Sequence, residues 1–174
     1  MKRLLLLRHA KAEQHGKDDH ARRLTERGLR DAARMGAFLH EHGDVPDLVL
    51  CSTSARTRET WQQASEELGG APKIEFLKPL YLAPVKTVLA IVQKADDAAR
   101  TVLVIAHSPG TEETAGALAR TSSDKDERSR LEAIKEKFPT AALAVLDFDI
   151  VHWSGVKPGS GALAAFVRPK DLDS

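Results

Sequence analysis

The segment Leu4-Leu5-Leu6-Leu7 changes abruptly into Arg8 and His9, close to the start of the chain. Four apolar residues without polar alternation are typical of a strand buried on both faces, as in the centre of a parallel sheet. Residues directly past the carboxyl end of such a strand lie at the edge where open α/β folds bind ligands. We therefore expect Arg8 and His9 to be held on a rigid support and to face a crevice.

Short apolar runs alternate with helix-like stretches along the rest of the chain. The predicted strands after the first cover residues 47–52, 73–77, 101–106, 142–148 and 162–167. The predicted helices cover residues 26–43, 54–69, 85–94 and 111–120. This alternation predicts an α/β fold, a three-layer α/β/α sandwich around a mostly parallel central sheet.

Three local features complete this prediction. Ser108 is expected to cap the helix of residues 111–120, with Pro109 at its first position. Residues 121–137 are highly charged and fit either a solvated helix or a mobile insertion. Residues 11–23 form a polar loop that is long for a strand-to-helix connection, and long loops are more often functional.

The composition limits the class of protein. A chain of 174 residues, 42% hydrophobic and 29% charged, is expected to form a single domain over residues 1–174. The net charge of +1 gives no overall positive field for nucleic acid, so no nucleic acid partner is expected. The apolar runs are far shorter than the roughly 20 residues of a membrane helix. One cysteine, Cys51, excludes an internal disulfide framework. Residues 1–7 resemble the start of a signal peptide, but the apolar part is too short, so we expect a cytoplasmic protein without a membrane partner.

Three predicted strands end in residues that suit a phosphate site. The first strand delivers Arg8 and His9, and two later strands deliver Arg56 and His107. Arginine offers a planar fork that matches phosphate oxygens, and helix N-termini add backbone N–H donors. If these strands are neighbours, the four side chains form a compact cationic pocket for a phosphoryl group.

Histidine gives such a pocket chemistry as well as charge. A neutral imidazole is a nucleophile near pH 7, and a covalent step divides phosphoryl transfer into two easier displacements. The arginines and the second histidine would stabilise charge on the transferring oxygens. These cations make a metal unnecessary, and the sequence offers no obvious carboxylate cluster to hold one. No metal or other cofactor is therefore expected.

Each of these residues, taken alone, also fits a structural role. An Arg–His pair after a strand can have a purely structural role, such as capping a turn. Solvated arginines are ordinary on a helix. The combination at three strand ends favours a functional site. The other histidines lack that setting, and they are His15, His20, His40, His42 and His152. For His40 and His42 a plain surface role is expected.

Three motifs stand at the ends of the predicted strands: Arg8-His9-Ala10, then Ser52 with Arg56 and Thr60, then Val104-Ile105-Ala106-His107. In this order they resemble the signatures of the histidine phosphatase superfamily, also called phosphoglycerate mutase-like proteins. Residues 19–28 and 107–110 are similar to the SixA-type phosphohistidine phosphatases within it. The resemblance spans nearly the whole chain and implies the phosphoglycerate mutase-like fold.

The resemblance also implies roles for individual residues. The implied catalytic residues are His9, Arg8, Arg56 and His107. The implied substrate-binding residues are Arg22, Asp19 and Ser108. His9 would be the nucleophile that becomes phosphorylated, and Arg8, Arg56 and His107 would hold the phosphoryl oxygens. Asp19 would orient the phosphate or assist proton transfer.

Two positions depart from the family pattern. Ala10 stands where the family has glycine, which adds a methyl group where the backbone approaches closely. Larger relatives carry a glutamate as general acid after the strand that matches residues 73–77, but residues 78–83 contain no carboxylate. A phosphoamidate leaving group needs less help with protonation than an alkoxide. The missing acid therefore favours a phosphohistidine substrate and argues against a mutase.

The sequence thus predicts a metal-independent hydrolase, a phosphatase that works through a phosphohistidine intermediate, with protein phosphohistidine as the favoured substrate. One alternative is a phosphatase of a small phosphorylated metabolite. The other is a non-catalytic module that binds phosphate or a phosphoprotein. The expected partner is a phosphorylated protein or a small phosphorylated substrate, and the oligomeric state and the identity of the general acid stay open.

Overall fold

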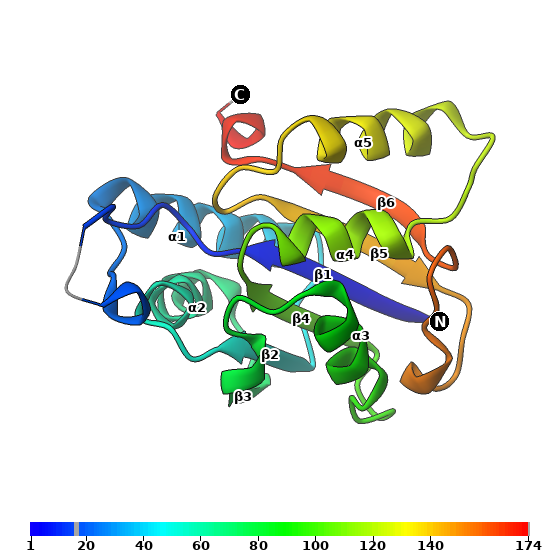
Figure 1. Ribbon diagram of the computed structural model, residues 1–174, viewed down its shortest axis with the longest axis horizontal. Helices are drawn as coiled ribbons and strands as arrows, with labels where there is room; N and C mark the ends of the chain where they lie inside the picture. Colours follow the sequence, from blue (N-terminus) through cyan, green and yellow to red (C-terminus); the bar gives the residue numbers. More distant parts are fainter. Residues whose placement is uncertain (16–17, 174) are drawn as a thin grey trace.

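The computed structural model describes residues 1–15 and 18–173 (Figure 1), so residues 16 and 17 of the predicted polar loop lie outside the described residues. The strands are β1 (Lys2–Arg8), β2 (Leu48–Ser52), β3 (Lys73–Leu77), β4 (Thr101–Ala106), β5 (Leu143–Phe148) and β6 (Ala162–Val167). The helices are α1 (Glu26–Glu41), α2 (Ala55–Leu68), α3 (Val85–Gln93), α4 (Gly110–Leu118) and α5 (Lys125–Glu136). None of these helices is long and apolar enough to cross a membrane.

The strands form one sheet in the order β3-β2-β4-β1-β5-β6. β4 lies between β1 and β2 and runs parallel to both, with Arg8 paired to Ala106 and Cys51 paired to Ile105. β3 is parallel to β2, whereas β5 and β6 are antiparallel to their neighbours. The predicted mostly parallel sheet is confirmed, and the three strand ends that carry the site motifs are neighbours.

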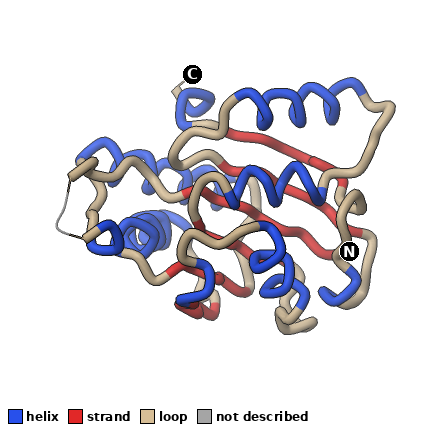
Figure 2. The backbone as a smooth tube through the Cα atoms, viewed as in Figure 1, coloured by secondary structure: helices blue, strands red, loops and turns tan. Residues whose placement is uncertain are grey.

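Helices cover both faces of the sheet, which confirms the predicted three layers (Figures 1 and 2). Leu4 and Leu6 of β1 pack in the core shared with α3, α4 and α5, whereas Leu5 and Leu7 pack in the core shared with α1 and α2. All four leucines are fully buried. This two-sided burial explains the unbroken apolar run, and each buried leucine contributes about 1.5–3 kcal/mol of hydrophobic stabilisation.

Local signals set the boundaries of α1 and α2. Thr25 caps α1 by accepting a hydrogen bond from the Gly28 N–H at 3.0 Å. Ser54 caps α2 by accepting from the Thr57 N–H at 3.3 Å. Such caps satisfy N–H groups that have no partner inside the helix. α2 ends before Gly69, whose φ of 72° lies in the region that favours glycine.

Two expectations about the later helices are settled by the structure. Ser108 does not cap α4, because Pro109 occupies the N-cap and α4 begins at Gly110. The Ser108 hydroxyl instead donates to Glu112 Oε2 at 2.8 Å, and a hydrogen bond to a carboxylate is stronger than one to a neutral group. The charged stretch of residues 121–137 contains the helix α5, so the helical alternative is confirmed.

Gly36 allows α1 to pack closely against α2. A Cβ atom at this position would overlap the carbonyl oxygen of Ala64. We expect Gly36→Ala to lower the free energy of unfolding by about 1–3 kcal/mol, because overpacking forces the backbone to shift. Urea unfolding measures this loss. Gly116→Ala in α4 is the matched control, since nothing lies within 4 Å of a Cβ there, and equal losses in both variants would contradict the prediction.

Candidate active site

Hydrogen bonds to neighbouring segments fix His9 at the carboxyl end of β1. The His9 N–H donates to the Ala106 carbonyl at 3.1 Å, and the Ala141 N–H donates to the His9 carbonyl at 3.0 Å. In the side chain, His9 Nδ1 lies 2.7 Å from the Ala10 carbonyl oxygen. A carbonyl oxygen only accepts, so Nδ1 carries the proton and Nε2 of the neutral ring keeps its lone pair. Nε2 is therefore the ring nitrogen that is available to act as a nucleophile.

Two hydrogen bonds of the Thr60 hydroxyl explain the spacing of Ser52, Arg56 and Thr60. This hydroxyl donates to the Arg56 carbonyl at 2.7 Å and accepts from the Ala10 N–H at 3.0 Å. It thereby ties the first turns of α2 to the loop that follows β1. Ser52, at the end of β2, shares a 2.8 Å hydrogen bond with Nε2 of His107. Thr60 thus connects the start of α2 to the loop after β1, and Ser52 connects the ends of β2 and β4. Arg56, between them in the motif, brings a cation to the same place.

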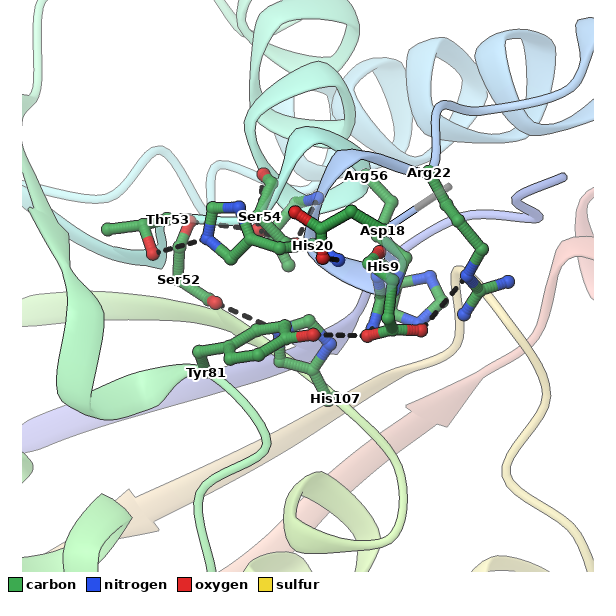
Figure 3. Close-up of polar contacts among 12 residues, drawn as sticks. His9, Asp18, His20, Arg22, Ser52, Thr53, Ser54, Arg56, Tyr81 and His107 are labelled. Atoms are coloured by element: carbon green, nitrogen blue, oxygen red, sulfur yellow. Dashed lines mark hydrogen bonds and ion pairs between the residues drawn. The ribbon is translucent and has the colours of Figure 1, made fainter. Parts of the chain in front are cut away.

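His9 and His107 lie beside each other, with their ring centroids 5.4 Å apart (Figure 3). Burial lowers the pKa of His9 to about 4, and the charges of Arg56 and Arg8 act in the same direction. Burial likewise lowers the pKa of His107 to about 3, and the neighbouring His9 lowers it further. Both imidazoles are therefore neutral at pH 7, which is the form that a nucleophilic histidine requires.

Asp19 brings a carboxylate to the arginines from the short 3-10 helix η1 (Asp19–Ala21). Its Oδ2 accepts from Arg56 at 3.1 Å, and its Oδ1 accepts from Arg22 at 3.0 Å. The Tyr81 hydroxyl donates to the same carboxylate. The bond from Tyr81 and then those from the arginines lower the pKa of Asp19 to about 2. Asp19 is therefore ionised at pH 7 and suited to orient cations rather than to donate a proton.

One cavity of about 600 Å³ brings the predicted site residues together. All seven line it, namely Arg8, His9, Asp19, Arg22, Arg56, His107 and Ser108. Lys11, Arg27 and Lys137 add three more cations to its wall, whereas Asp19 is its one acidic lining residue in the described part of the chain. The cavity is thus strongly cationic although the chain as a whole carries a net charge of +1. Residues 1–15 and 18–173 contain no group of three or more His, Cys, Asp or Glu side chains placed to hold a metal ion.

Unpaired polar atoms gather at this site. Across the described residues, four buried side-chain nitrogen or oxygen atoms have no hydrogen-bond partner. Three of them belong to the predicted catalytic set, and they are Arg8 Nε, Arg56 Nε and His107 Nδ1. A buried polar atom without a partner costs about 1–3 kcal/mol, so such atoms are rare in a stable fold. Their concentration in one place fits a site whose remaining partner is an anionic ligand.

Tyr81 and His20 join the site without a sequence signal that predicts them. The Tyr81 ring lies 5.3 Å from the ring of His107 and 4.8 Å from that of His20. His20, which follows no predicted strand, also shares a 2.9 Å hydrogen bond with the Thr53 hydroxyl beside the site. Tyr81 lies in a turn and His20 in a 3-10 helix of three residues, and neither is long enough for a periodic pattern to show which way a side chain faces.

A parallel α/β sheet that presents a neutral histidine among arginines at its strand ends defines a site for phosphoryl transfer. Comparisons with known proteins agree with this class. Residues 4–80 match the family model of the histidine phosphatase superfamily (branch 1). An uncharacterised protein of Mycobacterium tuberculosis is 38% identical over 165 residues, which cover 94% of this chain and 100% of that protein.

Two similar solved structures are SixA proteins, each named as a candidate phosphohistidine phosphatase. The one from Nakamurella multipartitia is 29% identical, with a TM-score of 0.84 over 97% of this chain and 96% of that chain. The one from Agrobacterium tumefaciens is 30% identical, with a TM-score of 0.78 over 97% and 98%. The chain belongs to the histidine phosphatase superfamily and is of the SixA type, as its motifs predict.

Ala10 replaces the glycine of the family motif without disturbing the site. Its side chain is fully buried and packs in a small apolar cluster with Leu24, Ala32 and Ala141. The extra methyl group therefore adds apolar contact within this cluster. The departure that the sequence shows at this position is compatible with the family geometry.

The neutral state of His9 and His107 can be tested by NMR. We expect both imidazoles to stay neutral down to about pH 5 and to titrate only near pH 4 and pH 3. Because these values lie below the unfolded value of about 6.5, the folded chain binds fewer protons between about pH 3 and 6.5, and acidification through that range destabilises the fold. Imidazole signals assigned with His9→Gln and His107→Gln provide the measurement, and midpoints near 6.5 would refute it.

Proposed function

We propose that this protein is a metal-independent phosphatase that forms a phosphohistidine on His9. The observation that carries the proposal is the state of His9. It is a buried, neutral imidazole whose Nδ1 is held by the Ala10 carbonyl, which leaves Nε2 as the nucleophile in a cavity lined by arginines. Family membership supports phosphatase activity of this type.

In the proposed first step, His9 Nε2 attacks the phosphorus, a P–N bond forms, and the bond to the leaving group breaks. Arg8, Arg56 and Arg22 line the same cavity and bind the oxygens on which negative charge is spread. If the Ser52 hydroxyl donates to Nε2 of His107, the proton of that ring resides on Nδ1. The unpartnered Nδ1 then donates a further hydrogen bond to the phosphoryl group.

In the second step, water attacks the phosphohistidine, phosphate leaves, and the electron pair of the P–N bond returns to Nε2. The proposal needs no metal for either step, because the arginines and His107 provide the positive charge and the hydrogen-bond donors that a metal would otherwise supply.

Protein phosphohistidine is the favoured substrate. A departing imidazole is readily protonated, so it tolerates a site whose lining carboxylate, Asp19, is ionised and whose segment 78–83 lacks a glutamate. Both SixA relatives named above are described as candidate phosphohistidine phosphatases. Lys11, Arg27 and Lys137 extend the positive charge beyond the phosphoryl site, which suits a large acidic partner.

A labelled phosphodonor tests the nucleophile. We expect wild-type protein to form an acid-labile, alkali-stable adduct, and His9→Ala to form none and to lose at least about 10³-fold in phosphatase rate, because the attacking nitrogen is gone. His42→Ala is the matched control, since His42 is exposed and rests on Phe38. Full activity in His9→Ala would refute the mechanism. A wild-type protein that binds phosphate but forms no adduct and releases none is the non-catalytic binding module instead.

A substrate panel with and without a metal chelator tests the substrate class and metal independence. The panel contains a phosphohistidine peptide, sugar phosphates and an aryl phosphate. We expect the phosphohistidine peptide to react fastest, by about 10²-fold or more over the sugar phosphates, since Asp19, the one acidic side chain that lines the described cavity, is ionised and cannot protonate an alkoxide. The chelator should leave the rates unchanged. Fastest turnover of a sugar phosphate would favour the metabolite phosphatase, and loss of activity with chelator would overturn metal independence.

A further inference from the structure

A half-buried carboxylate, that of Glu112, is hydrogen-bonded to a residue that lines the cavity. Glu112, in the first turn of α4, has one oxygen, Oε1, that is buried and has no hydrogen-bond partner among the described residues. Its other oxygen, Oε2, accepts from the Ser108 hydroxyl at 2.8 Å. Ser108 lines the cavity, whereas Glu112 does not. The pair thus connects a half-buried carboxylate to the cavity through a single hydroxyl.

The start of α4 explains why this hydroxyl is available. Pro109 occupies the N-cap, so the Ser108 side chain caps no helix N–H. One turn separates Ser108 from Glu112, which brings their side chains to the same side of the helix start. Gly110 lets this turn pack closely against the segment that contains Ala83, because a Cβ at position 110 would overlap the Ala83 carbonyl oxygen.

We propose that Ser108 and Glu112 form a proton relay that activates water when the phosphohistidine on His9 is hydrolysed. The relay rests on the proposed function and concerns its second step. Water oxygen bonds to phosphorus while the P–N bond breaks and its electron pair returns to His9 Nε2. One water proton passes to Ser108 Oγ, whose own proton passes to Glu112 Oε2. Phosphate leaves as the monohydrogen dianion, and Glu112 then gives the proton to solvent.

The other titratable groups of the cavity suit this task less well. His9 is itself the group that leaves, and His107 is a weak base because burial lowers its pKa to about 3. Asp19 accepts from Tyr81, Arg56 and Arg22, so its oxygens are already engaged. Among the described residues, the Glu112 carboxylate accepts a hydrogen bond from Ser108 only. From the cavity it feels the charge of Arg8, whose pKa burial lowers while the charge of Glu112 acts in the opposite direction.

Separate measurement of adduct formation and adduct decay tests the relay, with phosphoramidate as the phosphodonor. Its ammonia leaving group already carries its protons, so formation should be unchanged in Glu112→Gln. Adduct decay should fall by about 10²-fold or more, the usual effect of losing a general base, and the labelled adduct should accumulate. Glu113→Gln is the matched control, because Glu113 is exposed in the same helical turn.

Two further variants separate a relay from a structural effect. Ser108→Ala should slow decay to a similar extent, and the double variant should be no slower than either single variant, since the two residues act as one unit. Glu112→Asp should recover part of the decay rate. Wild-type decay in Glu112→Gln, an equal loss in formation and decay, or a multiplicative loss in the double variant would overturn the relay alone. Failure of the wild-type protein to form any adduct would overturn the proposed function as well.

Discussion

The register of the three parallel strands β1, β4 and β2 is the constraint on which the site depends. β4 pairs with both β1 and β2 in such a register that the three strands end at the same edge of the sheet, and the residues that follow them lie side by side there. A slip of one residue would turn Leu5 and Leu7 to the opposite face of the sheet and would bury the wrong side chains. The same slip would separate His9 from His107. Hydrophobic packing on two faces therefore fixes the distance between two imidazoles, and stability and site geometry have one origin.

The site keeps positive charge without neutralising it fully. Arg8 donates to the Phe138 carbonyl at 2.9 Å, and Arg56 donates to the Asp19 carbonyl at 2.8 Å. Carbonyl acceptors hold each guanidinium in a defined orientation but cancel little of its charge. That remaining charge, together with burial, keeps His9 neutral. The groups that bind a phosphoryl oxygen thus also prepare the nucleophile.

The sequence predicts the strands and the four candidate catalytic residues better than it predicts the other residues of the site, such as Tyr81. Buried runs such as Leu4 to Leu7 carry their signal locally, and a residue that follows such a run must lie at the sheet edge. Tyr81 reaches Asp19 only because two irregular segments meet in space. The expected cap at Ser108 is wrong because its hydroxyl bonds to Glu112, a preference that the helix-start pattern does not contain. The antiparallel pairing of β5 with β1 likewise depends on contacts distant in sequence.

The contacts of Asp19 have a consequence for the release of product. Since its carboxylate already pairs with Arg56 and Arg22, an oxyanion that takes the same donors displaces the carboxylate from them. Affinity for phosphate is then the difference between two anion–arginine pairings rather than the full value of one. A departing phosphate is replaced by a tethered competitor that is always present at high local concentration. We therefore expect rapid exchange at the site and only weak inhibition by free phosphate.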